Sequence, residues 1–183
     1  MSSSKVNQEE KSSYTDRIVY YRRKIVVVMA LLSPLAMYGA VISSINSMAP
    51  DKPIETFIES CSIDSQKCVQ LGPTYFRSQG LNELRFSAPL SEVESASFRW
   101  IESQSRTEII FDAPDLTHAV FVTSFWRFRD DFLVQVLCDG DDTIIWVHST
   151  SRLGVNDLGV NFARVEKFHK YMNSQTFSDG SCR

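Results

Sequence analysis

The sequence predicts an α+β protein: one N-terminal transmembrane helix, then a compact domain in which two helices cover a four-stranded antiparallel sheet. Three observations support this fold class. Residues 25–48 form a long run without a charged side chain. Four strand-like runs between residues 107 and 151 are joined by short turns rich in Asp, Gly and Pro, which is typical of antiparallel neighbours. A segment with helical periodicity precedes these runs and another follows them.

Length and composition fit one globular domain with accessory segments. The chain has 183 residues, of which 22% are charged, and its formal net charge is −3. Nucleic-acid-binding proteins usually concentrate basic residues on one face, and nothing here predicts such a face, so we expect no nucleic-acid partner. We divide the chain into a polar N-terminal tail (residues 1–24, disordered over residues 1–11), a transmembrane helix (25–48), a linker (49–60) and an α+β domain (61–183).

The apolar run is long enough to cross a bilayer. About 20 apolar helical residues span the hydrocarbon core of ~30 Å, and residues 25–48 exceed that length. Pro34 and Gly39 are tolerated, because such residues are common in transmembrane helices. The alternative is a cleaved signal peptide, since residues 47–49 resemble a cleavage site. A signal peptide has an apolar core of only roughly 7–15 residues and no long polar tail before it. Residues 25–48 are longer and follow such a tail, so an uncleaved anchor is favoured.

Charges on the two flanks predict the orientation of this helix. Four basic residues lie between positions 17 and 24, whereas only Lys52 closely follows the run. The positive-inside rule places the N-terminus in the cytoplasm, or in a matrix or stroma equivalent, and the C-terminal domain on the opposite side. We expect a single-pass protein of a bacterial inner membrane or an organelle membrane. Its expected partners are the lipid bilayer, through residues 25–48, and other membrane proteins.

Two helices are predicted in the domain. Ser91 and Glu94 match a capping box, and apolar residues recur every three or four positions from there to residue 103. The second helix is expected at residues 158–173, with Asn156 or Asp157 as its N-cap.

The strands of the sheet are predicted between the two helices. Alternating or continuous apolar patterns place them at residues 107–111, 117–128, 132–138 and 143–151. An Asp-Gly pair between the last two indicates a hairpin. Residues 84–88 are compatible with a further short strand outside this four-stranded meander.

Two of the four cysteines, Cys61 and Cys68, lie close together in the sequence. Their spacing does not match the Cys-x-x-Cys pattern of metal and redox sites. On the oxidising side of a membrane a local disulfide is the natural interpretation. Closing so short a loop stabilises the fold by roughly 2–3 kcal/mol through chain entropy. Cys138 and Cys182 either pair with each other or leave Cys138 as a buried thiol.

The segment from residue 149 to residue 167 has more polar side chains than an ordinary strand-to-helix connection. It contains Ser-Arg-Leu-Gly at residues 151–154, Asp-Leu-Gly-Val-Asn at 157–161 and Arg-Val-Glu at 164–166. This pattern resembles the signature of the DUF1499 family, a domain of unknown function. Phe128 with Asp130 and Asp131, and the first two cysteines, also resemble family segments. The resemblance covers most of residues 61–167 and implies a fold without implying an activity.

Six polar residues of these segments are expected to form one network at the end of the sheet: Arg152, Asp157, Asn161, Arg164, Asp130 and Asp131. In the structural interpretation they fix the strand-to-helix turn, because Arg pairs bidentately with carboxylates and an Asp at a helix start accepts backbone N–H bonds. In the alternative interpretation they form a pocket for a polar group, with Arg152 binding an anion.

No catalytic, cofactor or metal motif accompanies this network. Ser149, His148 and Asp157 could be arranged on paper as a catalytic triad, but the nucleophile-elbow motif is missing. The three histidines lack a favourable zinc spacing, and the acidic turn at residues 139–142 lacks the EF-hand pattern. We therefore predict a non-enzymatic protein with no catalytic residue, no cofactor and no metal.

Without a catalytic, cofactor or metal motif, two functions from different classes are favoured. The first is a membrane-anchored interaction module: an accessory, assembly or scaffold subunit of a membrane protein complex. A single anchor and a small domain without a chemical motif favour it. The second is a lipid-binding or small-polar-ligand-binding protein with its site near Arg152. An enzyme is the least favoured interpretation of the sequence.

Overall fold

The computed structural model describes residues 3–183 and, within the first helix, the side chains of Arg17 and of the residues from Val19 onward. Two compact units are present, Met1–Ser44 and Ile45–Arg183. Helix α1 extends over Ser3–Met48, so the disorder predicted for residues 1–11 is wrong from Ser3 onward; Met1 and Ser2 lie outside the described residues. Once a helix is nucleated, extending it by further residues costs little.

Within α1, the 30 residues Val19–Met48 are long and apolar enough to cross a membrane, a test that a signal sequence also passes. Pro34 lies inside this stretch and has no N–H to bond the carbonyl of Ala30. The Ser33 hydroxyl donates to that carbonyl oxygen at 3.3 Å. The backbone group released by the proline is therefore satisfied within the helix, as an apolar environment requires.

The domain is built on a six-stranded antiparallel sheet, two strands more than predicted. The strands are β1 (Cys68–Leu71), β2 (Leu84–Phe86), β3 (Thr107–Ala113), β4 (Leu116–Val122), β5 (Arg129–Asp139) and β6 (Asp142–Ser151). Their order is β1-β6-β5-β4-β3, and β2 also pairs with β6. The two strands outside the predicted meander are only four and three residues long, and both pair with the outer edge of β6.

The four central strands lie near their predicted positions, but β4 is shorter than expected. The predicted strand of residues 117–128 ends at Val122, and residues 123–128 form the β4–β5 loop. Two hydrogen bonds close this loop: the Thr123 N–H donates to the Phe128 carbonyl, and the Phe128 N–H donates to Thr123 Oγ1, each at 2.9 Å. Arg127, with φ 59°, supplies the left-handed residue that reverses the chain.

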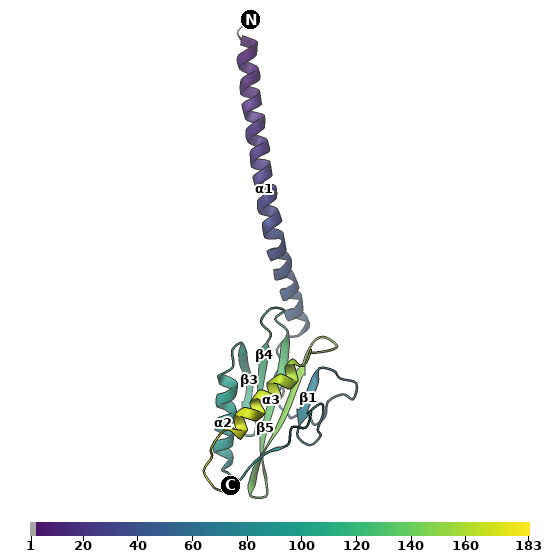
Figure 1. Cartoon of the computed structure of the whole chain (residues 1–183), viewed down its shortest axis with the longest axis vertical. Coiled ribbons are helices and arrows are strands. Elements are labelled where there is room, and N and C mark those ends of the chain that lie inside the picture. Colours follow the sequence, from purple (N-terminus) through teal and green to yellow (C-terminus); the bar gives the residue numbers. More distant parts are fainter. Residues whose placement is uncertain (1–2) are drawn as a thin grey trace. The chain divides into compact units, whose positions relative to one another are not determined.

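Helices α2 (Leu90–Glu102) and α3 (Val160–Asn173) cover one face of the sheet, as predicted (Figure 1). The capping-box prediction is wrong, because α2 begins one residue before Ser91, its N-cap is Pro89, and no side chain caps it. The core lies between helices and sheet, and the ring of Phe132 packs against those of Trp100, Phe121 and Phe168. Both helices and the sheet thus meet in one aromatic cluster.

The opposite face of the sheet is covered by residues 49–60, which we call the strap. The sequence predicted a linker here. The Ile54 N–H instead donates to His118 Nδ1 at 3.0 Å, and the Phe57 ring lies 5.8 Å from that of Trp146. Ile54 and Phe57 are each partly buried. Ile54 and Phe57 bury apolar surface against the sheet face that the helices leave uncovered. This burial explains why the segment packs on the sheet and does not extend freely.

Each of the two disulfides joins a strand of this sheet to a segment outside it. Cys61 pairs with Cys68, as predicted, and joins the end of the strap to β1. Cys138 pairs with Cys182, which resolves the open alternative and fixes the C-terminal segment to β5. All four cysteines of the chain are therefore oxidised.

Candidate functional site

The signature residues extend from the last residue of β6 through the β6–α3 loop into the first turns of α3, and this loop lies beside the β4–β5 loop at the same end of the sheet. Gly154 (φ 87°) and Gly159 (φ 81°) have left-handed backbone conformations, which glycine adopts without steric cost. Gly159 is the formal N-cap of α3 and has no side chain. The capping role therefore falls to Asp157, whose carboxylate accepts the N–H of Gly159 at 3.1 Å and of Asn161 at 2.9 Å.

On the helix side of the sheet, Arg164 lies at the centre of a buried polar cluster. Its Nη2 donates to Asp130 Oδ2 at 2.7 Å and its Nη1 to Ser149 Oγ at 2.9 Å, while the Ser149 hydroxyl donates to Asn161 Oδ1 at 2.7 Å. The guanidinium carbon lies 4.4 Å from the centroid of the Phe121 ring. We call Asp130, Ser149, Asn161 and Arg164 the helix-face cluster. It joins α3 to β5 and β6 through charge-assisted hydrogen bonds and a cation–π contact.

Asn161 extends this cluster to the edge of the sheet. Its Nδ2 donates to the carbonyl of Lys67 at 2.9 Å and to Ser151 Oγ at 3.0 Å. Both partners lie where β1 begins and β6 ends. The asparagine thus adds a donor to the Lys67 carbonyl, which also accepts the Ser151 N–H at 3.1 Å, and supplies one to the Ser151 hydroxyl.

On the strap side, Arg152 binds Asp131 and the first residues of the strap. Its Nε donates to both carboxylate oxygens of Asp131, at 3.1 and 3.0 Å, and its Nη2 donates to Oδ1 at 2.7 Å. Nη1 donates to the carbonyls of Ala49 (3.3 Å) and Pro50 (2.9 Å) and to Asp51 Oδ1 (2.6 Å). All three guanidinium nitrogens are thus engaged inside the domain, and the side chain is only 11% exposed.

His118 completes this second group. Its Nδ1 accepts the Ile54 N–H, so the ring proton lies on Nε2, which donates to Asp131 Oδ1 at 2.7 Å. We call Asp51, His118, Asp131 and Arg152 the strap-face cluster. Burial raises the pKa of Asp131, but the bonds from His118 and Arg152 outweigh burial, and the net pKa is lowered. Burial lowers the pKa of Arg152, yet Asp131 and Asp51 keep it above its usual value.

His148 lies on the same face, next to the first disulfide. Its Nδ1 is 2.9 Å from Gln70 Oε1 and its Nε2 is 3.6 Å from Cys68 Sγ. Burial lowers the pKa of His148 to about 4, so the ring is neutral at neutral pH. Cys61, Cys68 and His148 place their ligand atoms within 4.8 Å of one another. Both sulfurs are consumed by the disulfide, however, and only thiolates bind metal strongly.

The structure therefore divides the predicted network in two. Asp130, Asn161 and Arg164 meet on the helix side, while Arg152 meets Asp131 on the strap side. Asp157 joins neither ion pair; besides its capping bonds, it lies 3.7 Å from Arg77. The triad drawn from Ser149, His148 and Asp157 does not assemble, because successive residues of β6 point to opposite faces. His118, Asp51 and the strap were missed by the sequence analysis; the spaced apolar residues Ile54 and Phe57 were the available signal.

A cavity of about 370 Å³ lies between the two loops at this end of the sheet. Its polar lining includes Asp130 and Asp157, both engaged in the bonds described above. The rest of the lining is mainly apolar and comes from Phe125, Trp126, Phe128, Leu153, Leu158 and Val160. The signature loop therefore forms one wall of an apolar cavity next to the Arg152 site.

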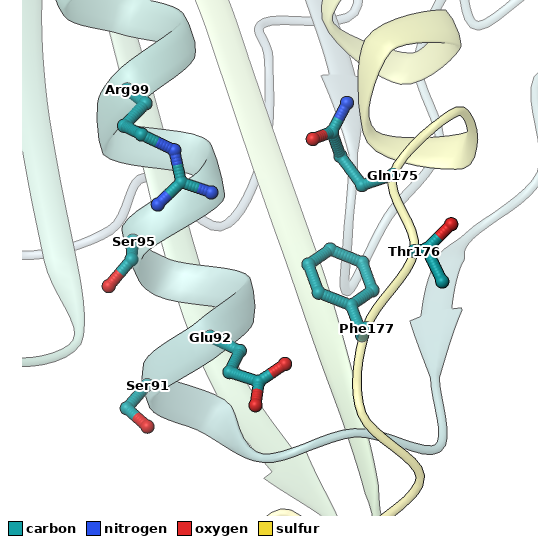
Figure 2. A pocket seen from close by; sticks show the side chains of 7 residues that line it. All are labelled: Ser91, Glu92, Ser95, Arg99, Gln175, Thr176 and Phe177. Carbon is teal, nitrogen blue, oxygen red and sulfur yellow. The ribbon is translucent and has the colours of Figure 1, made fainter.

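A second pocket, of about 340 Å³, lies between α2 and the segment that follows α3 (Figure 2). Glu92, Arg99 and Phe177 are among its lining residues. Glu92 accepts the Ser178 N–H at 2.9 Å, which lowers the pKa of its carboxyl group. The carboxylate thus attaches the C-terminal segment to α2, and this pocket contains none of the signature residues.

Comparison with known proteins assigns the family. Residues 42–172 match the family described as "Protein of unknown function (DUF1499)". The chain belongs to the DUF1499 family. The match covers the last turns of α1, the strap, the whole sheet and both domain helices except the last residue of α3. The matched range includes the loop that carries Arg152 of the strap-face cluster and forms a wall of the apolar cavity.

Two solved structures are similar to parts of this DUF1499 chain. CalU16 from Micromonospora echinospora is 15% identical, with a TM-score of 0.37; the alignment covers 50% of this chain and 73% of that one. TTHA0849 from Thermus thermophilus is 12% identical, with a TM-score of 0.26, covering 58% of this chain and 88% of that one. At these scores neither likeness establishes a shared fold. No curated protein matches the chain.

Proposed function

We propose that this chain is a non-enzymatic, single-pass membrane-anchored interaction module: an accessory, assembly or scaffold subunit of a membrane protein complex. One observation carries the proposal. The residues that directly follow the apolar helix do not form a free tether, because Arg152 binds Ala49, Pro50 and Asp51 to the end of the sheet. The segment that joins the apolar helix to the domain is thus packed as part of the domain, which suits a module that acts beside other membrane proteins.

The anchor itself is supported by α1. Residues Val19–Met48 are long enough to span a bilayer with some tilt, and Ser33 satisfies the carbonyl released by Pro34. Basic residues before the span favour an N-terminus on the cytoplasmic, matrix or stromal side. Two disulfides agree with this orientation, since they persist where thiols are oxidised.

The runner-up is a protein that binds a lipid or small ligand near Arg152. An anion held by Arg152 is disfavoured, since every nitrogen of its guanidinium group already donates to an acceptor within the domain. The apolar cavity of about 370 Å³ next to it is what supports this second function, because small-molecule sites of ~300–1,000 Å³ are mostly apolar.

Purification of the full chain in mild detergent separates the two functions. The interaction module predicts a stable complex with other membrane proteins, whose size falls when the complex is dissociated in harsher detergent. A monomer that carries an extractable lipid or small molecule would support the second function. Protease treatment of sealed vesicles tests the orientation: the domain should be protected from the cytoplasmic side, and its cleavage there would refute the proposed topology.

A further inference from the structure

Exposed apolar side chains of the domain are concentrated at one end. Seven large hydrophobic residues after Met48 are exposed. Four of them lie in two adjacent loops (Phe125, Trp126, Val155 and Leu158), and a fifth, Val160, begins α3 directly after the second loop. We call residues 123–128 and 153–160 the apolar loop pair. Single exposed apolar residues are ordinary, whereas a gathered set marks a surface that contacts a partner or a membrane.

Leu158 shows that this exposure is not a by-product of packing. Its side chain is 92% exposed, so it contributes almost nothing to the core. Its φ is 54°, a left-handed conformation that is a clear outlier for a bulky residue. Strained backbone of this kind usually occurs at functional sites. The fold thus holds an apolar side chain outward at an energetic cost.

The chain enters the domain next to this loop pair. Met48 ends the candidate span, and Asp51 lies three residues later, at most about 11 Å along the backbone. Asp51 is bound by Arg152, which directly precedes the second loop, and by Arg129, which directly follows the first. The apolar loop pair is therefore held close to the point where the span ends.

We propose that the apolar loop pair inserts into the headgroup–acyl boundary of the bilayer that α1 crosses. This rests on the proposed function, since it requires α1 to be an anchor. The composition fits a lipid surface: Trp126 has an apolar body with a polar N–H, the kind of ring enriched at membrane interfaces. Arg127 is exposed beside it and supplies a cation for lipid phosphates. Amphipathic segments bind membranes at this boundary, with their apolar side chains about 5–10 Å deep.

Fluorescence quenching by brominated lipids tests this contact in the full chain. The protein is reconstituted in phosphatidylcholine vesicles with bromine either near the headgroup or near the acyl-chain end. Only three tryptophans are present and α1 contains none, so all tryptophan emission, excited selectively, comes from the domain. Shallow bromine is expected to quench wild type strongly, and Trp126→Phe should lose most of that quenching. The matched variant Trp146→Phe, at the ring that packs against Phe57 of the strap, should retain it.

A second pair of variants changes the surface and leaves the reporter in place. Leu158→Asn removes an exposed apolar group and keeps a residue that tolerates positive φ, so quenching at Trp126 should fall. Tyr75→Asn, at an exposed residue near Glu83 and Arg85, should leave the quenching unchanged.

Two kinds of outcome separate the lipid contact from the proposed function. Release of the protein from the vesicles by alkaline carbonate would refute the anchor and with it the proposed function. If the protein stays anchored but Trp126→Phe is quenched as strongly as wild type, the lipid contact alone is overturned. The same holds if a photo-crosslinking residue placed at position 158 labels protein and not lipid.

Discussion

Two arginine–aspartate pairs lie back to back on β5. Asp130 points toward the helices and pairs with Arg164 of α3, whereas Asp131 points toward the strap and pairs with Arg152. The chemistry is the same, with an Nη2–carboxylate distance of 2.7 Å in each pair. The partners differ: the first pair bonds only to sheet and helix, and the second also bonds to Asp51 and two strap carbonyls. The first pair stabilises the fold, and the second attaches the residues after the apolar helix to that fold.

Removing the helix-face arginine should have the largest effect. Arg164→Ala leaves Asp130 buried without its cation, which destabilises a protein by roughly 3–5 kcal/mol. Denaturant titration of the full chain in detergent, followed by near-ultraviolet circular dichroism, measures the change. In the double variant Asp130→Asn/Arg164→Ala the loss should be smaller than the sum of the two single losses. Additive losses would show that the two groups do not interact.

Acidification should destabilise the fold through the buried His148. Burial lowers the pKa of His148 from 6.5 to about 4, so between these pH values the unfolded chain binds more protons than the folded one. Stability is therefore full above about pH 6.5 and falls by roughly 3 kcal/mol as the pH approaches 4. Asp131, whose pKa is also lowered, adds a loss below its unfolded pKa of about 3.9. Denaturant titrations should give a sloping profile for wild type between pH 6.5 and 5 and a nearly flat one for His148→Gln over the same range, above the unfolded pKa values of the carboxyl groups.

Asp157 tests the start of α3 apart from the Arg152 and Arg164 ion pairs, although its carboxylate also lies 3.7 Å from Arg77. Asp157→Ala removes the acceptor of two N–H groups at the start of α3 and should cost about 0.5–2 kcal/mol, as for other capping residues. Asp157→Asn keeps a carbonyl oxygen that can accept one of these bonds, and should lie between the alanine variant and wild type in a thermal melt. A loss as large as that of Arg164→Ala would mean that Asp157 belongs to the ion-pair cluster after all.

Leu158 should show the smallest effect, and in the opposite direction. Leu158→Gly relieves a left-handed backbone conformation and removes an exposed side chain, so stability should rise by about 0.5–1 kcal/mol. Differential scanning calorimetry should show a higher melting temperature. A clear loss would show that the leucine packs within the fold, contrary to its role as an outward-facing group.

Much of the fold was predictable because its elements are local. The central strands and both domain helices follow from apolar periodicity, and the first disulfide from spacing and compartment. β1 and β2 were not counted in the sheet because strands of four and three residues have too little pattern to distinguish them from loops. Residues 123–128 were predicted as strand because Phe and Trp favour strands; side-chain bonding by Thr123 and the positive φ of Arg127 override that preference.

The site was predictable in its residues and not in its arrangement. Alternation along β5 requires Asp130 and Asp131 to face opposite sides, so a single network including both was excluded by the sequence pattern itself. The strap contacts could not be derived in this way, because Arg152 and Ala49 are far apart in the chain. Pairings at that distance depend on which sheet face the helices leave uncovered.

Hydrogen exchange of the strap in Arg152→Ala tests the central claim most directly. We expect faster exchange in residues 51–60, including the Ile54 amide that bonds His118, with unchanged protection in α3. The variant should also lose roughly 2–3 kcal/mol of stability without added ligand, between the values for exposed and buried ion pairs. Arg164→Ala is the matched control and should reduce protection in α3 first. An Arg152→Ala protein at least as stable as wild type, with an unchanged strap, would contradict this account and identify Arg152 as a ligand-binding residue.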